Sequence, residues 1–412
     1  MKATKLVAVL AAAGLVLAAC GDDDDDDAAS TDTTAAEAAE AVDTTAAGAT
    51  DTTAAGATDT TAAGATDTTA AGATDTTAAG ATDTTAAGSA PAGSEVPVDC
   101  EAPEPIEELN IGLVTDVGKV DDKSFNQSAW EGVQAAAETA GVTANYIETA
   151  AATDYGSNIG QFVDSGANVI VTAGSALTEA TAAAATDNPD ITFIGIDQIQ
   201  KRTVCNLTGL VFNEDKAGFL AGALAGLLTE SGTIASVLGT DQVPPVVAFG
   251  EGFENGAKHT NEGVQVITTY HPGGLDVAFT DPEWGATTAR QALDNGADIV
   301  FGAGGLTGNG ALTEVARQEG ALCIGVDTDQ WETVPDARPC LVTSAMKLIN
   351  EGVQELVAAA VDGSIVPGNF SGDVGLADFH DLADRVPAEV VTQMDELTEQ
   401  VLSGEVETGY QP

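Results

Sequence analysis

The chain has 412 residues and a formal net charge of −51, with 64 acidic against 13 basic residues. Such a charge repels the phosphates of nucleic acids and anionic lipid head groups, so we expect no nucleic-acid partner. The three histidines are scattered and no Cys/His spacing typical of a metal site occurs, so we expect neither a metal nor a cofactor.

Residues 1–20 predict a lipoprotein signal peptide. Two lysines precede an apolar run from Leu6 to Leu17, which is too short for a permanent span of about 20 residues. The run ends in Leu17-Ala-Ala-Cys20-Gly21, which resembles a bacterial lipobox, in which the cysteine is lipidated and becomes the mature N-terminus. We therefore expect an extracytoplasmic protein that acyl chains on Cys20 anchor to the cell membrane.

Residues 21–105 predict a disordered acidic tether. After the run Asp22 to Asp27, the unit Asp-Thr-Thr-Ala-Ala-Gly-Ala-Thr occurs six times from Asp43, with the last copy varied at its end. A unit without Leu, Ile or aromatic residues cannot bury a core. The tether holds 19 acidic and no basic residues, so the part after it keeps 45 acidic and 11 basic residues.

The stretch from Ile111 to Gly141 predicts a buried strand followed by a helix. A short apolar run begins at Ile111, and Ser124 followed three residues later by Gln127 matches a capping box. Apolar residues then recur at helical spacing up to Ala140, and Gly141 is a typical stop.

Polar and aromatic side chains gather between that strand and that helix. Asp116 follows the strand, and Phe125 and Asn126 open the helix. Open α/β sheets bind ligands at the carboxyl ends of their strands, so this loop is a candidate ligand-binding site. Asp197 follows a second apolar run, Ile194-Gly-Ile, in the same way. We expect these polar groups to bind a ligand, with helix or turn capping as the alternative role for each.

Apolar runs and helical patterns alternate over the rest of the chain. This alternation predicts an α/β fold with two lobes built on parallel sheets. The expected strands are residues 168–172, 191–196, 207–212, 233–238, 264–269, 299–302, 322–326 and 340–344. The expected helices are residues 131–140, 158–165, 177–186, 215–228, 248–260, 284–295, 310–319 and 345–361.

Four cysteines follow Cys20, namely Cys100, Cys205, Cys323 and Cys340. An even number in an exported protein favours disulfides, and three pairings are open. We favour Cys100 with Cys205 and Cys323 with Cys340, because the last two begin neighbouring predicted strands.

The string TDVGKVDDKSFNQSAWEG resembles the signature of the basic membrane protein family of substrate-binding lipoproteins, also called the purine nucleoside receptor A-like family, which serves ABC importers. Further matches cover residues 106 to 412. They are Phe249-Gly-Glu-Gly-Phe253, Asp281-Pro282, Gly302-Ala-Gly-Gly305 with Thr307-Gly308, Gly325-Val-Asp327-Thr-Asp-Gln330, and Thr343-Ser344 with Lys347.

The resemblance implies a type I periplasmic-binding-protein fold with two Rossmann-like lobes and a hinge that the chain crosses several times. The first lobe would comprise residues 106–212 and 345–375, and the second residues 213–344 and 376–412. It also implies a monomer that captures a nucleoside, a purine one, in the cleft and delivers it to the permease and ATPase subunits of an importer. No hydrolase motif is present, so we expect no enzyme.

The resemblance further implies roles for single residues. Phe125 and Phe249 would stack on the two faces of a base, whereas Phe253 would pack inside its lobe. Asp327 and Lys347 would bind the ribose hydroxyls, with a simple ion bridge between them as the alternative.

The glycine-rich run of residues 302–310 includes Gly304, which we expect at the ligand. The run lacks the ending of a P-loop, so close approach to a sugar or to the opposite lobe explains its glycines better. Two other functions stay open: binding of another small polar ligand, such as a sugar or a modified base, and a sensory receptor that does not serve import.

Overall fold

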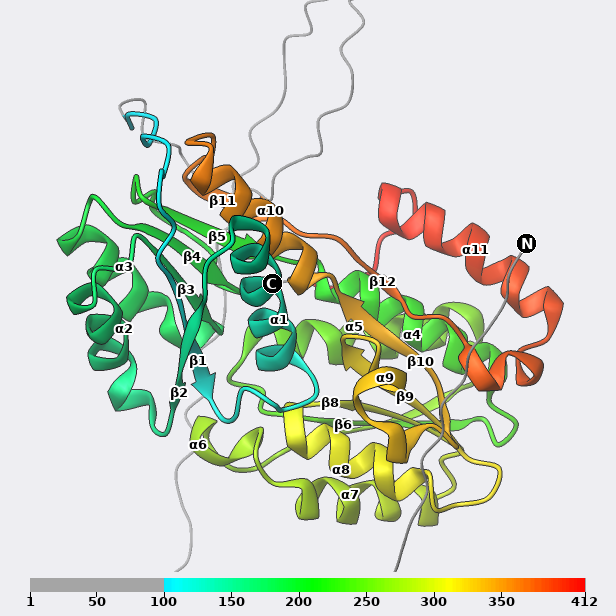
Figure 1. The fold of residues 1–412 in the computed structure, drawn as a ribbon. Helices are drawn as coiled ribbons and strands as arrows, with labels where there is room; N and C mark the ends of the chain where they lie inside the picture. Colours follow the sequence, from blue (N-terminus) through cyan, green and yellow to red (C-terminus); the bar gives the residue numbers. More distant parts are fainter. Residues whose placement is uncertain (1–99, 412) are drawn as a thin grey trace, which may run out of the picture. The chain divides into compact units, whose positions relative to one another are not determined.

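The computed structural model describes residues 100–411, which form two lobes, each with a six-stranded sheet at its centre (Figure 1). The expected signal peptide, the lipidated Cys20 and nearly all of the tether lie outside the described residues. Both lobes have the α/β architecture that the alternating pattern predicts.

The first sheet has the strand order β11-β5-β4-β3-β1-β2, and all neighbouring strands in it run parallel. The second sheet has the order β12-β10-β9-β8-β6-β7 and is parallel except for β12, which pairs antiparallel with β10. The strands of the first sheet are β1 Ile111–Val117, β2 Asn145–Thr149, β3 Val169–Ala173, β4 Thr192–Ile196, β5 Leu207–Val211 and β11 Gly368–Ser371. Those of the second are β6 Thr233–Leu238, β7 Gln265–Tyr270, β8 Ile299–Ala303, β9 Leu322–Asp327, β10 Leu341–Lys347 and β12 Val374–Leu376.

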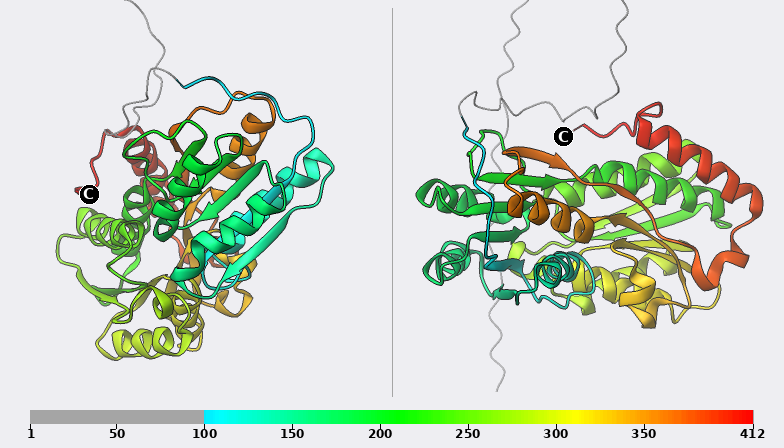
Figure 2. Two further views of the ribbon diagram at one scale, coloured as in Figure 1. Left: turned by 90° about the vertical axis from the view of Figure 1, so that its left-hand side faces the viewer. Right: turned by 45° about the horizontal axis from the view of Figure 1, so that its top comes forward.

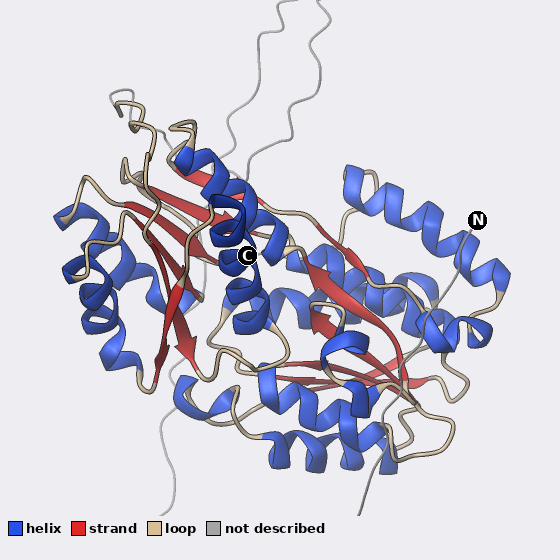
Figure 3. Cartoon of the chain, viewed as in Figure 1, coloured by secondary structure: helices blue, strands red, loops and turns tan. Residues whose placement is uncertain are grey.

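Helices cover both faces of each sheet (Figure 3). In the first lobe α1 and α10 pack on one face, and α2 and α3 on the other; in the second lobe α4 and α5 lie opposite α7 and α8. The first-lobe helices are α1 Phe125–Ala140, α2 Tyr155–Asp164, α3 Thr178–Asp187 and α10 Ile349–Val361. The second-lobe helices are α4 Glu214–Leu228, α5 Pro244–Thr260, α6 Leu275–Ala278, α7 Pro282–Asp294, α8 Gly305–Val315, α9 Gln330–Thr333 and α11 Ala388–Ser403.

Burial explains why the sequences of the central strands are unbroken apolar runs. Every residue of β3, β4, β5, β8 and β9 is buried, because helices cover these strands from both sides. The edge strands β2 and β7 are partly exposed and more polar. For that reason the sequence pattern missed β2 and gave the central strands almost at their true bounds.

Several elements begin or end elsewhere than expected, among them α5, α8 and β10. Helix α5 begins at Pro244, before the expected start at residue 248, because proline fits the first helical turn without losing a hydrogen bond. Helix α8 begins at Gly305, inside the glycine-rich run. Strand β10 continues to Lys347, so the helix expected from residue 345 starts only at Ile349.

The chain crosses between the lobes at three places, which Figure 2 shows from two further directions. It leaves the first sheet after β5, returns to the first lobe between β10 and α10, and leaves it again between β11 and β12. The lobe boundaries expected at residues 344/345 and 375/376 fall inside β10 and β12, because both strands remain in the second sheet.

Two disulfides join the four cysteines in the pairing favoured from the sequence. Cys100 is bonded to Cys205 and Cys323 to Cys340, with Cα–Cα distances of 5.4 and 5.1 Å. The first closes a loop over a sequence separation of 105 residues and ties the start of the described chain to the segment between β4 and β5. The second is buried in the second lobe, where Cys323 lies in β9 and Cys340 directly precedes β10.

Candidate functional site

A cavity between the two lobes contains about 620 Å³ of space outside the protein atoms, including open solvent at its mouth. Its wall includes all eight residues that the sequence predicts at the ligand, so the fold brings them together from distant parts of the chain. They are Asp116, Phe125, Asn126, Asp197, Phe249, Gly304, Asp327 and Lys347. The other lining residues are Val117, Asp122, Gly174, Ser175, Val243, Pro245, Val246, Phe279, Ala303, Gly305 and Val326.

Asp122 holds the loop that begins α1. Its carboxylate accepts hydrogen bonds from the backbone N–H groups of Ser124 at 3.0 Å, Asn126 at 3.0 Å and Gln127 at 3.1 Å. Burial raises the pKa of Asp122 to about 6, against the opposing effect of these N–H groups. The carboxylate thus occupies the helix N-terminus, where negative charge is stabilised.

The capping box predicted at Ser124 is therefore wrong. The Ser124 side chain makes no capping hydrogen bond; its Oγ donates to Asp327 Oδ2 of the second lobe at 2.6 Å. The Gln127 side chain donates to Glu131 on the next helical turn instead of reaching back. Asp122 competes successfully for the free N–H groups because a carboxylate is a stronger acceptor than a hydroxyl.

Asp116 is fixed in orientation at the end of β1. Its Oδ1 accepts hydrogen bonds from the Tyr155 hydroxyl and from the Val117 N–H at 2.7 Å, while its own N–H donates to Asn126 Oδ1 at 3.3 Å. Gly174, at φ 108°, leaves the room that Oδ2 occupies, since a Cβ there would overlap it. Burial raises the pKa of Asp116, and the Tyr155 hydrogen bond lowers it.

Asp197 and Asp327 occupy equivalent positions in the two lobes. Asp197 directly follows β4, the strand next to β3, and Asp327 ends β9, the strand next to β8. Both have left-handed backbone conformations, with φ values of 59° and 65°, which aspartate tolerates better than most residues. This turn aims each carboxylate at the cavity, so the lobes face each other there with one acidic group each.

Lys347 lies between these carboxylates with only 2% of its side chain exposed. Its Nζ is 2.7 Å from Asp197 Oδ2, 3.6 Å from Asp327 Oδ1 and 3.7 Å from Glu214 Oε1. Burial acts to lower the pKa of Lys347, but the three acidic groups together raise it above its usual value. The side chain therefore stays an ammonium, and its closest partner is Asp197 of the opposite lobe rather than the expected Asp327.

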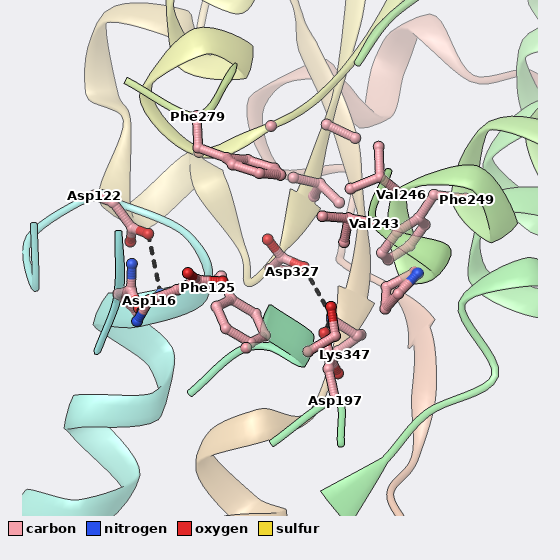
Figure 4. A pocket seen from close by; sticks show the side chains of 18 of the residues that line it. Asp116, Asp122, Phe125, Asp197, Val243, Val246, Phe249, Phe279, Asp327 and Lys347 are labelled. Carbon is pink, nitrogen blue, oxygen red and sulfur yellow. Dashed lines mark hydrogen bonds and ion pairs between the residues drawn. The ribbon is translucent and has the colours of Figure 1, made fainter. Parts of the chain in front are cut away.

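Three phenylalanine rings, Phe125, Phe249 and Phe279, line the cavity, and the first two also lie near this ammonium. Lys347 Nζ lies 4.6 Å from the Phe125 ring centroid and 5.7 Å from that of Phe249, distances at which a cation is attracted to a ring. Phe249 is only 3% exposed and packs against Phe301, whereas Phe125 and Phe279 are half-buried. In Figure 4, Phe125 and Phe279 lie on opposite sides of the cavity.

Phe253 has no access to the cavity, as expected. It is fully buried and stacks on Phe301 with the ring centroids 5.0 Å apart. Phe279 and Glu214 were missed by the sequence analysis. Phe279 follows the four-residue helix α6, for which the sequence gives no signal, but Glu214 lies beside the lobe boundary expected between residues 212 and 213.

The glycine-rich run serves packing within the second lobe. A Cβ on Gly304 would lie 2.8 Å from the backbone nitrogen of Gly239, and one on Gly310 would overlap the carbonyl oxygen of Pro282. The expected approach of this run to the opposite lobe is therefore wrong for these glycines. The contact with the opposite lobe comes from Asn309, which lies between them.

Side chains of the second lobe hold the first lobe by its α1 loop. Asn309 Nδ2 donates to the carbonyl oxygen of Asp122 at 2.7 Å. Gln330 Nε2 and Thr333 Oγ1 both donate to the carbonyl oxygen of Lys123, at 3.1 and 2.8 Å. These bonds, with that from Ser124 to Asp327, close the lobes over the cavity.

The lining offers carboxylates, one ammonium and aromatic rings as its means of recognition. Among residues 100–411, no group of three or more His, Cys, Asp or Glu side chains is arranged to hold a metal ion. In the same part of the chain, no helix has both the length and the apolar character that a membrane crossing needs.

Comparison with known proteins gives a match to a family described as ABC transporter substrate-binding protein, PnrA-like, over residues 110–409. This range includes both lobes and every lining residue of the cavity. The chain belongs to this PnrA-like family. As a member, it is the ligand-binding component of an ABC transporter, which works with permease and ATPase components.

Relatives of this PnrA-like protein carry several names. The ABC transporter nucleoside-binding protein BmpA of Lactococcus lactis is 30% identical over 234 residues, which cover 54% of this chain and 65% of that protein. Basic membrane protein A1 of Borrelia garinii is 29% identical, covering 73% and 88%. The CD4+ T-cell-stimulating antigen of Listeria monocytogenes is 28% identical, covering 74% and 89%.

Solved structures show the same fold as this PnrA-like protein. An ABC transporter solute-binding protein from Aeropyrum pernix has a TM-score of 0.64 at 24% identity, and the match covers 73% of this chain and 92% of that one. A second one, from Conexibacter woesei, has a TM-score of 0.59 at 24% identity, covering 73% and 98%. The periplasmic-binding-protein fold expected from the sequence is thereby confirmed.

Proposed function

We propose that this protein captures a nucleoside, with a purine base, in the cavity between its lobes and delivers it to the permease of an ABC importer. The observation that carries the proposal is the pair of half-buried rings, Phe125 and Phe279, on opposite sides of the cavity between the lobes. A planar base inserted between them would gain stacking on both faces. Phe279 takes the place that we expected for Phe249, because the Phe249 ring is buried against Phe301.

The polar groups of the cavity suit the two ends of a nucleoside. Asp116 and Asn126 lie at the wall formed by β1 and α1, where they can bind the edge of a base. Asp327 and Lys347 lie at adjacent strand ends, where a carboxylate accepts from a hydroxyl and an ammonium donates to one. Vicinal ribose hydroxyls match such a pair, and the name of the Lactococcus relative agrees with this ligand class.

Ligand binding selects the closed form in this proposal. A ligand shifts the equilibrium between open and closed lobes only through contacts that differ between the two forms. Phe125 and Asp116 belong to the first lobe, and Phe279 and Asp327 to the second, so a nucleoside touches both sets only when the lobes are closed.

The proposal predicts tight binding of purine nucleosides in calorimetric titration. The protein is unfolded and refolded to remove carried-over ligand, and then titrated with adenosine, guanosine, inosine, cytidine and ribose. We expect purine nucleosides to bind at least tenfold more tightly than cytidine, and ribose to bind weakly, because ribose lacks the base that stacks. Chromatography of the recovered ligand is expected to show the unchanged nucleoside, since no turnover is proposed.

Other outcomes of this titration point to other ligands or roles. Tight binding of ribose alone would indicate that the ligand is a sugar. Absence of binding to all of these compounds, by a protein shown to be folded, would contradict nucleoside capture. A hydrolysed product would contradict the absence of catalysis. Loss of nucleoside uptake in cells that lack the protein distinguishes import from a purely sensory role.

We also propose that the mature protein is a monomer anchored by lipid on Cys20. The support is the lipobox-like sequence Leu17-Ala-Ala-Cys20-Gly21, since acyl chains on a cysteine hold a protein at a membrane surface. Cys20→Ser is expected to release the protein from the membrane fraction. Mass spectrometry of wild-type protein from membranes should show a mass above that of the polypeptide from Cys20, and equal membrane association of both proteins would contradict the anchor.

A further inference from the structure

A buried group of charges lies behind the cavity and contains one acidic residue that the ligand does not need to touch. Glu214, the first residue of α4, is 7% exposed and does not line the cavity. Its Oε1 lies 3.7 Å from Lys347 Nζ, which also lies 2.7 Å from Asp197 Oδ2, so both acidic side chains meet at the same buried ammonium. Glu214 belongs to the second lobe and Asp197 to the first, so the two carboxyl groups meet at this ammonium from opposite lobes.

A hydrogen bond between two carboxyl groups requires a proton on one of them, because an ionised carboxylate has no donor. Asp197 Oδ2 already accepts from Lys347 at 2.7 Å, while Asp197 Oδ1 is buried and receives no N–H or hydroxyl donor. A protonated Glu214 supplies the donor that this carboxylate lacks. The ammonium of Lys347 is 1.0 Å nearer to Asp197 than to Glu214, so it stabilises the charge on Asp197 and leaves the proton on Glu214.

We propose that Glu214 is a positioning residue that carries a proton: its neutral carboxyl donates to Asp197 across the lobe boundary, so that closing the lobes on a ligand takes up a proton. The proton holds Asp197 and Lys347 in the positions from which they face the cavity. Without it, two negative carboxyl groups would face each other across the boundary and favour opening.

The surroundings of Glu214 favour its neutral form. Burial, with a smaller contribution from the charge of Asp197, raises the pKa of Glu214 to about 8 against the opposing charge of Lys347. Asp215 on the same helix also raises it, and Tyr410 of the C-terminal segment faces it as a second titratable group. Opening the lobes would admit water and remove Asp197, and both changes lower the pKa of Glu214 toward its ordinary value.

The sign of the pH effect follows from this difference. The pKa of Glu214 is higher in the closed form, so closure is favoured at low pH and becomes weaker as the pH rises through neutrality to about 8. Above that pH both forms have lost the proton, and the affinity becomes constant. The slope is at most about tenfold in Kd per pH unit, because one proton is involved.

Calorimetric titration with the purine nucleoside that binds most tightly tests this inference, which rests on the proposed function for its probe. Between pH 6.5 and 8 we expect the Kd of the wild type to rise, by up to about tenfold per unit, and to level off above pH 8. At pH 7, titrations in buffers of different ionisation enthalpy should show uptake of up to one proton. The range begins at pH 6.5 because Asp122, with a pKa of about 6, titrates below it.

Glu214→Gln removes the titratable proton but keeps the shape of the side chain. Its amide still donates to Asp197 but cannot titrate, so both the slope and the proton uptake should vanish. Asp215→Asn is the matched control: Asp215 accepts from Thr408 and only raises the pKa of Glu214, so its variant should keep the proton uptake and the slope, with the slope levelling off at a lower pH. A pH-independent wild type, or a Glu214→Gln variant with the wild-type slope, would overturn the inference.

Failure of the proposed function gives a different result. If no nucleoside binds at any pH, carbon NMR of the carboxyl groups decides the inference in the closed protein as recovered, before its carried-over ligand is removed, with Glu214→Gln identifying the signal. A titration midpoint above pH 6 would support the shared proton even though nucleoside capture had failed. A midpoint near the ordinary value of about 4.3 would overturn it.

Discussion

Lys347→Ala is expected to lower the affinity for purine nucleosides by at least about 100-fold, which corresponds to about 3 kcal/mol. The variant removes the donor proposed for the ribose and leaves Asp197 and Asp327 facing each other in a buried site without their cation. Removing one partner of a buried ion pair is costly because the remaining charge loses its compensation. Calorimetric titration of the folded variant measures the loss.

The free base provides the internal comparison for this variant. If Lys347 binds the ribose, the affinity for the base alone should fall much less than that for the nucleoside, and Asp327→Ala should show the same difference. Equal losses for both ligands would contradict the ribose assignment. Lys216→Ala is the matched control, since the side chain of this half-buried lysine of the second lobe donates only to the carbonyl oxygen of Leu402 among the described contacts.

Gly222→Ala is expected to lower the free energy of unfolding by about 3 kcal/mol or more. Helices α4 and α5 pack so closely that a Cβ on Gly222 would overlap the carbonyl oxygen of Phe253, nearer than the 3.0 Å that real Cβ atoms keep. Gly256 on α5 meets the carbonyl oxygen of Phe219 on α4 in the same way. The backbone on both sides is part of a helix, so the added methyl group forces the helices apart.

Urea denaturation with a spectroscopic readout measures this loss. Gly160→Ala is the control, because Gly160 lies in α2 with nothing within 4 Å of an added Cβ, and alanine is the better helix former there. This control should be as stable as the wild type or more stable. A Gly222→Ala variant of wild-type stability would show that the helices can separate at little cost.

The close packing of α4 and α5 also bears on the site. Helix α4 begins with Glu214, and α5 carries Phe249, the ring that Lys347 contacts from the cavity wall. A shift of the helix pair would therefore move the charges behind the cavity. We expect folded glycine variants of this pair to lose ligand affinity as well as stability.

Much of the candidate site was predictable because it follows from local rules. Asp116 and Asp197 follow apolar runs, and parallel strands bring such residues to the same edge of a sheet. The capping residue was not predictable in this way. Ser124 and Gln127 match a capping box, but Asp122 also reaches the free N–H groups, and only the path of the loop decides between them.

The sequence by itself determined the α/β class, the central strands, the favoured disulfide partners and the residues of the cavity wall that follow strands or carry family motifs. These features depend on periodicity, on the ends of single elements and on motifs of neighbouring residues. The tertiary structure alone decided which charges meet. Lys347 pairs most closely with Asp197, 150 residues away, Glu214 reaches this ammonium from the start of α4, and Phe279 joins the site after a four-residue helix that the pattern did not give. Such contacts depend on how the two lobes close on each other. No local property of the chain specifies the distance between side chains on different lobes.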